Sequence, residues 1–345
     1  MPGPPLCQSA MCCRLWILYG DRADLQCWSG ARGCHIATGR GAGPGWLLWV
    51  VFSGKLCLRI RGGEQHMIQV VMDTTTGMTR QEFDQSGIAM VSLYVRDGDK
   101  LYREQVDIFP DEFYQREREG LIYETAQTNP ADLVSVFKPI VEAGDEAICV
   151  LISSAISGSV NAAHVAVQML GAEDRITIVD SLESGYGEAY LGHTAKKMAD
   201  AGENRVEIVR ALADIRSRTR TYFIMESLKW LFHGGRLTGA QYFVGSVIKL
   251  NPIVWFDEAG RMTSYDKTRT IKVAKDHMRQ LVADCGKNGV EAATLHWPDN
   301  LDEAQGFHAE MEEILQAPVS YTKLSCVLGV HTGPDLLGPC IIMKA

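Results

Sequence analysis

The stretch EAICVLISSAISGSVNAAHVAVQMLGAEDRITIVD, residues 146–180, decides the fold. It opens with an apolar strand, Ile148 to Ile152, and passes through a serine-rich turn into a helix predicted over 159–170. Gly171 follows at the place where a left-handed residue commonly ends a helix. A strand predicted at 175–180, with Ile176, Ile178 and Val179 as its apolar residues, then follows. This order is typical of a βαβ unit, in which the two strands are parallel.

The same alternation of apolar strands and helical periods extends along the chain from residue 67 onward. Pro110 suits the first position of a helix, with Asp111 and Glu112 next to its positive end. The alternation indicates a parallel sheet covered on both faces. Further strands are predicted at 67–73, 88–95 and 221–226, and further helices at 131–143, 187–200 and 205–218.

The pattern changes after about residue 203. Ile253 to Phe256 and Met262 to Tyr265 flank residues 257–260, a spacing that predicts a β-hairpin rather than a crossover. We therefore expect an α/β protein with two domains, an N-terminal parallel-sheet βαβ domain over 67–202 and a C-terminal mixed α/β domain over 203–345. In the second domain, helices are predicted near 270–285 and 302–316, and strands near 291–297, 319–325 and 340–344.

Residues 1–66 differ in composition from the rest. They hold six of the ten cysteines and four of the seven tryptophans, and their seven Lys or Arg against three Asp or Glu give a net charge of +4. Glycine-rich pieces such as 39–45 interrupt every candidate helix or strand. The cysteine spacing matches no zinc-ligand pattern. We expect residues 1–66 to be a disordered leader or a mis-annotated start, with translation beginning at Met67.

Composition excludes several classes of protein. Among the 345 residues, 34 basic and 42 acidic side chains give a net charge of −8, which disfavours nucleic acid as a partner. The longest apolar run, Trp46 to Phe52, is far shorter than the roughly 20 residues of a membrane-spanning helix. We expect no integral membrane association. The four cysteines after residue 67 are scattered and flanked by apolar residues, as in a reduced cytoplasmic protein.

Four polar clusters, at 125–130, 153–159, 233–236 and 331–334, could carry chemistry. Taken one at a time, each is equally typical of a helix cap or a turn. Together they supply Thr, Ser, Arg and His donors without an accompanying carboxylate pair or a Cys/His metal set, so no metal is expected. The glycine spacings of nucleotide-binding loops are missing. Donors without acceptors suggest that an anion such as a carboxylate is bound.

From about Met67 to the C-terminus, the chain resembles the DegV family of bacterial fatty-acid-binding proteins, which includes the acyl-carrier subunits of fatty acid kinase. Family motifs recur in family order, although no single motif is decisive. The matching segments are Met72–Thr75, Thr125–Asn129, Ser153–Ser159, Asp180–Gly187, His233–Leu237, Asn251–Ile253 and His331–Asp335.

The resemblance implies a carrier protein without catalytic residues or a cofactor. One long-chain fatty acid such as palmitate would lie in a tunnel between the two domains. Its carboxylate would be bound by the hydroxyls of Thr125 and Ser157, by Arg236 and by His331. A separate fatty acid kinase would phosphorylate the presented carboxylate to an acyl phosphate for phospholipid synthesis.

Four positions depart from the family motifs. Ala126 replaces Ser, Thr128 replaces Pro, and Ala155 and Asp335 each replace Gly. Ala126 removes a possible hydroxyl donor. Asp335 adds a negative charge that we expect near the bound carboxylate.

Two other interpretations remain open. In the first, Ser157 is the nucleophile and His331 the base of an acyl hydrolase or transferase, although Ser157 does not lie in a G-x-S-x-G turn and only Asp335 could orient the histidine. In the second, the chain is a small-anion-binding α/β module. Apolar helix faces that line a tunnel and those that fill a core have the same period, so periodicity does not separate these interpretations.

Overall fold

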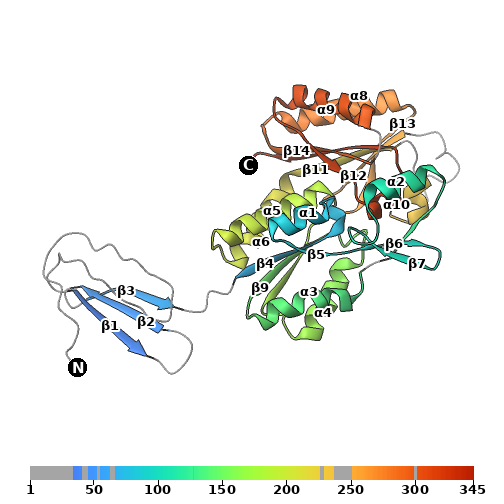
Figure 1. The fold of residues 1–345 in the computed structure, drawn as a ribbon. Helices are drawn as coiled ribbons and strands as arrows, with labels where there is room; N and C mark the ends of the chain where they lie inside the picture. Colours follow the sequence, from blue (N-terminus) through green and yellow to red (C-terminus); the bar gives the residue numbers. More distant parts are fainter. Residues whose placement is uncertain are drawn as a thin grey trace. The chain divides into compact units, whose positions relative to one another are not determined.

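The computed structural model describes residues 34–40, 46–52, 55–62, 67–126, 128–225, 229–236, 251–298 and 301–345. The chain divides into two compact units, Met1–His66 and Met67–Ala345 (Figure 1).

Three strands form an antiparallel sheet in the first unit. They are β1 (Cys34–Arg40), β2 (Trp46–Phe52) and β3 (Lys55–Gly62), in the order β1-β2-β3. The expectation that glycines interrupt every strand here is therefore wrong, because most glycines of residues 39–45 fall between β1 and β2 rather than inside them. The assignment of residues 1–66 as a leader stays a prediction.

A four-stranded parallel sheet forms the first layer of strands in the second unit. Its order is β10-β9-β4-β5, and each neighbouring pair is parallel. The βαβ unit predicted from residues 146–180 is confirmed as β9 (Glu146–Leu151), α4 (Ser159–Leu170) and β10 (Ile176–Asp180). The other two strands are β4 (Ile68–Asp73) and β5 (Ala89–Val91).

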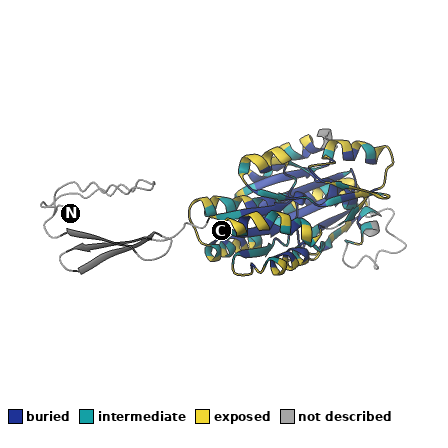
Figure 2. Ribbon diagram, turned by 60° about the horizontal axis from the view of Figure 1, so that its bottom comes forward, coloured by how far each residue is buried: buried dark blue, intermediate teal, exposed yellow. Residues whose placement is uncertain are grey.

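Helices cover both faces of this sheet. On one face, α3 (Pro130–Glu142) and α4 bury Leu133, Phe137 and Ala163 against the strands. On the other, a core joins α1 (Arg80–Ser86), α5 (Tyr186–Asp200) and α6 (Arg205–Arg218) to β4 and β9. The predicted parallel sheet with two covered faces is confirmed (Figures 1 and 2).

A mixed sheet of six strands forms the second layer of strands, in the order β13-β12-β11-β16-β14-β15. All of its pairs are antiparallel except β14 with β15. One face packs against α8 (Ile271–Gly286) and α9 (Leu301–Leu315), and α5 and α6 contact β16. The strands are β11 (Thr219–Met225), β12 (Asn251–Phe256), β13 (Met262–Thr268), β14 (Val290–Trp297), β15 (Ser320–Lys323) and β16 (Leu336–Met343).

Two predicted strands differ from the structure. The strand predicted at 88–95 is split into β5 and β6 (Tyr94–Asp97). The split occurs because the Leu93 amide donates to the Thr74 hydroxyl, after which the chain leaves the parallel sheet. β6 joins β7 (Lys100–Arg103) and β8 (Glu124–Ala126) in a small antiparallel sheet. The strand predicted at 221–226, β11, lies antiparallel to its neighbours in the mixed sheet.

Short helices complete the second unit. They are η1 (Thr74–Thr76), α2 (Pro110–Arg118), α7 (Lys229–Gly234) and α10 (Cys326–Thr332). The turn expected around His331 is instead the end of α10, whose start is capped by the Ser325 side chain, 3.1 Å from the Leu328 amide. Within the described residues, no helix is both long and apolar enough to cross a membrane.

Candidate functional site

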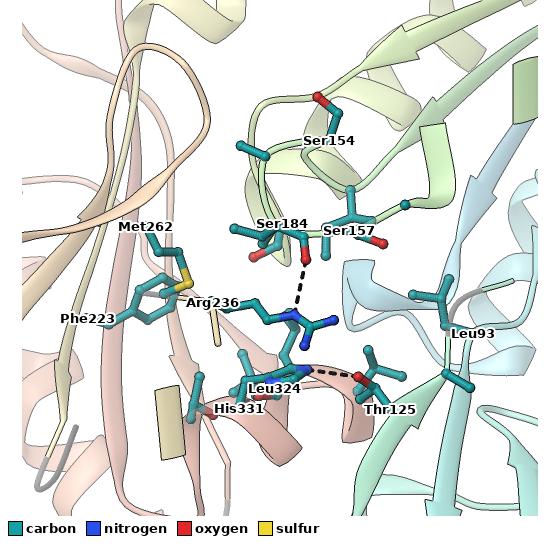
Figure 3. A pocket seen from close by; sticks show the side chains of 18 of the residues that line it. Leu93, Thr125, Ser154, Ser157, Ser184, Phe223, Arg236, Met262, Leu324 and His331 are labelled. Carbon is teal, nitrogen blue, oxygen red and sulfur yellow. Dashed lines mark hydrogen bonds between the residues drawn. The ribbon is translucent and has the colours of Figure 1, made fainter. Parts of the chain in front are cut away.

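A cavity of about 700 Å³ lies in the second unit, between the small sheet, the serine turn after β9, and α10. Thr125, Ser157, Arg236 and His331 all line it, although they are far apart in the sequence and come from four different segments (Figure 3). A volume of this size is in the range of sites that enclose a small organic ligand.

Thr125 and His331 form a hydrogen-bonded pair on one wall. Thr125 lies on β8, and its Oγ1 is 3.0 Å from Nε2 of His331, in the last turn of α10. The Nδ1 atom of His331 is buried and has no hydrogen-bond partner in the described part of the chain. Because an orphaned buried N–H is rarer than an orphaned acceptor, this arrangement favours a proton on Nε2 that is donated to Thr125. The Thr125 hydroxyl hydrogen is then available to a ligand.

His331 is held in its neutral form. Burial, together with the positive charge of Arg236, lowers the pKa of His331 to about 4. At neutral pH, the imidazole therefore offers a hydrogen bond rather than a charge.

Arg236 supplies the positive charge of the cavity. It follows α7, its Nε donates to the Ile156 carbonyl oxygen at 3.3 Å, and its Nη1 donates to the carbonyl of Gly234. Among the described residues, no carboxylate forms an ion pair with it. Burial lowers its pKa, but a guanidinium stays charged at neutral pH. A half-buried, unneutralised cation is a favourable site for an anion.

Ser157 lies on the serine turn that leads into α4. Its hydroxyl is 2.9 Å from that of Ser159, and its amide donates to the Ser153 carbonyl at 3.1 Å. In Figure 3, Arg236 lies between Ser157 and His331. No hydrogen bond joins Ser157 to His331 in the described segments, so the contact that a serine nucleophile needs with its base is not formed.

The rest of the wall is largely apolar. Phe223 and Met262 lie on the opposite side of Arg236 from Leu93 in Figure 3. The cavity therefore combines one cluster of donors with a surface on which a hydrocarbon chain can be buried. Its apolar side chains include Leu93, Ile152, Phe223, Met262, Leu324 and Leu328.

Four further polar residues line the wall without a predicted role, and one of them, Thr332, directly follows His331 in the cluster 331–334. Ser184 belongs to the segment Asp180–Gly187, which resembled the family but was given no role. Ser154 lies in the serine turn, where its amide donates to Asp180 at 3.1 Å. Arg96 has no sequence signal of its own, and it pairs with Glu124 at the surface.

The departures from the family motifs have different surroundings. Ala126 and Ala155 line the cavity, whereas Thr128 is buried and donates to the Ser92 carbonyl at 3.1 Å. Asp335 is not among the residues lining the cavity and forms an ion pair with Arg118 at 3.4 Å. The expectation that Asp335 places its charge beside the ligand is not supported by this position.

The described residues give little support for a metal site or for cysteine chemistry. They contain no group of three or more His, Cys, Asp or Glu side chains that could hold a metal. Cys149, Cys285, Cys326 and Cys340 are free and buried. In the described segments, the cavity is therefore lined by hydrogen-bond donors and apolar side chains.

Within the described part of the second unit, the fold and the cavity define an α/β protein with a pocket suited to an amphipathic anion. The chain belongs to the DegV family: the sequence model of this family, described as an uncharacterised protein of the DegV family, matches residues 67–344.

Relatives share most of their length with this chain. A DegV domain-containing protein of Caldanaerobacter subterraneus is 29% identical over 280 residues, which are 79% of this chain and 97% of the relative. The crystal structure of DegV from Bacillus subtilis, described as a fatty acid binding protein, has a TM-score of 0.73 and 27% identity, and the match covers 81% of this chain and 100% of that one. A DegV family protein from Thermus thermophilus, described by its fatty acid binding, has a TM-score of 0.72 and 25% identity with the same coverage.

Proposed function

We propose that this protein binds one long-chain fatty acid such as palmitate in the cavity, with the carboxylate on Thr125, Ser157, Arg236 and His331. The observation that carries the proposal is that these four donors line one largely apolar cavity. The fatty acid binding described for the Bacillus subtilis and Thermus thermophilus proteins supports it.

The two parts of the ligand have different roles in binding. Burial of a methylene contributes about 0.8 kcal/mol, so a palmitate tail offers roughly 11 to 12 kcal/mol before the costs of association. Arg236 and the hydroxyls offset the cost of removing the carboxylate from water. The tail therefore supplies affinity, and the donor cluster fixes the orientation.

We further propose that the protein is a carrier, and that a separate kinase phosphorylates the presented carboxylate to an acyl phosphate for phospholipid synthesis. The pairing of Ser157 with Ser159 instead of His331 favours a carrier over a hydrolase. A reconstituted reaction of the fatty-acid-loaded protein, ATP and the candidate kinase should form acyl phosphate, whereas loaded protein and ATP alone should not. Acyl phosphate formed without a kinase would contradict the carrier assignment.

Native mass spectrometry of protein purified without detergent, followed by lipid extraction, tests the binding proposal. We expect one fatty acid per chain and much lower occupancy in Arg236→Ala. Arg96→Ala is the matched control, because Arg96 also lines the cavity but is paired with Glu124. An empty wild-type protein, or a small polar anion in the extract, would favour the small-anion module instead.

A further inference from the structure

Two buried carboxyl groups lie close to the cavity but do not line it. Asp73 ends β4, and Glu188 lies in the first turn of α5. Both side chains are fully buried, and neither forms an ion pair with a described residue. They are joined by the Thr75 hydroxyl, whose Oγ1 is 2.5 Å from Oδ1 of Asp73 and 2.8 Å from Oε2 of Glu188.

These contacts require a proton on one of the two carboxyl groups. A threonine hydroxyl has one hydrogen, and an ionised carboxylate can only accept. Thr75 can therefore donate to one carboxylate only, and the other group must donate to Thr75. At most one of the two residues can therefore carry a negative charge.

The hydrogen bonds of each group indicate which one is protonated. Asp73 also accepts from the backbone amides of Thr75 at 2.8 Å and Ile152 at 3.0 Å, and such bonds favour the ionised form. The second oxygen of Glu188, Oε1, has no hydrogen-bond partner among the described residues. The proton therefore belongs on Glu188, which donates to Thr75, and Thr75 donates to Asp73.

Asp73 connects this chain of hydrogen bonds to the cavity. β9 ends at Leu151, and Asp73 binds the next amide, that of Ile152, just before the serine turn that contains Ser157. The neighbouring Thr74 hydroxyl accepts from the amide of Leu93 at 3.1 Å. Both Ile152 and Leu93 line the cavity.

We propose that Asp73 is a positioning residue that holds the serine turn against the ligand, and that a proton on Glu188 keeps Asp73 in this role. The inference rests on the proposed fatty acid site for its effect on affinity. Its structural part, the hold on the turn, is independent of the ligand.

The groups around Glu188 make its proton sensitive to pH. Burial raises the pKa of Glu188 well above its ordinary value, and the negative charges of Asp73 and Asp180 raise this pKa further. The thiol of Cys149 on β9 lies nearby, and its own pKa is raised well above the usual range. Glu188 is thus surrounded by acidic groups from β4, β9 and the end of β10.

The sign of the pH effect follows from this shift. Above the unfolded pKa of Glu188, near 4.5, the folded protein binds more protons than the unfolded chain, so stability is lost as pH rises through the folded pKa. In Glu188→Gln, the amide donates to Thr75 as the protonated acid does, at every pH. The stability of wild type should therefore fall relative to that of Glu188→Gln as pH rises.

The test compares the full-length wild type with Glu188→Gln and Asp73→Asn. At pH 7, subtracting the infrared spectrum of Glu188→Gln from that of wild type should leave the carbonyl band of a buried protonated acid. Amide hydrogen exchange of residues 152–158 should be about tenfold faster in Asp73→Asn and unchanged in Glu188→Gln. With cis-parinaric acid as the fluorescent probe, Asp73→Asn should weaken binding about tenfold, equivalent to about 1.4 kcal/mol.

Affinities are compared at one pH at a time, so that ionisation of the probe affects all variants equally. Slow exchange in Asp73→Asn combined with fast exchange in Glu188→Gln would place the proton on Asp73 and overturn the proposal. Unchanged exchange in both variants would overturn the positioning role. If wild type binds no probe while the infrared and exchange results hold, the fatty acid function fails and the structural part of this inference stands.

Discussion

Gly234 sets the distance between α7 and the His331 imidazole. A Cβ added at Gly234 would lie 2.0 Å from Nδ1 of His331, a contact that only movement of the ring or the helix can relieve. We expect Gly234→Ala to displace His331 from Thr125 and to weaken binding of cis-parinaric acid about tenfold. Gly306→Ala is the control, since that exposed position has open space around it. Equal affinities in the two variants would contradict this role of Gly234.

The protonation of His331 gives a second prediction at this scale. Because its folded pKa, about 4, lies below the ordinary 6.5, the folded state binds fewer protons than the unfolded chain between these values. The free energy of unfolding should therefore fall as pH drops from 6.5 toward 4, and His331→Gln should remove part of that slope. Denaturant titrations across this range measure the difference. A His331 resonance that titrates at its ordinary pKa in an NMR experiment would contradict the prediction.

Within the helical elements, α5 packs closely on the parallel sheet. A Cβ added at Gly192 would lie 1.7 Å from the sulfur of Met72 on β4. Overpacking of this kind typically costs 1 to 3 kcal/mol, so we expect the free energy of unfolding of Gly192→Ala to fall by about that amount. In Gly306→Ala on α9, it should instead rise by about 0.5 to 1 kcal/mol, because alanine favours a helix over glycine. A loss of stability in both variants would show that packing at Met72 is not the cause.

Elements set by local pattern could be predicted, and those set by a distant partner could not. The unit at 146–180 carries its own apolar strands and the glycine that ends its helix, and it was predicted correctly. The run 88–95 is apolar except for Ser92, but a single buried hydrogen bond from the Leu93 amide to Thr74 ends its pairing with β4. The helix that contains His331 was not predicted, because it is only seven residues long.

For the whole molecule, the site lies within one of the two compact units. Every residue that lines the cavity falls between Met67 and Ala345. We expect a protein shortened to these residues to bind cis-parinaric acid with the affinity of the full chain, measured by fluorescence titration. The full-length chain is the control, and a weaker affinity of the shortened protein would mean that residues 1–66 contribute to binding.

The sequence by itself determined the α/β class, the parallel sheet and the residue types of the site, because these follow from apolar periodicity and from motifs that are local in the chain. Only the tertiary structure brought Thr125, Ser157, Arg236 and His331 to one cavity and made Thr125 the hydrogen-bond partner of His331. It also placed Asp335 beside Arg118 and connected Asp73 to Glu188 through Thr75. Such contacts depend on how two sheets and their helices pack. When two residues are more than 100 positions apart in the chain, no local sequence pattern indicates that they lie close in space.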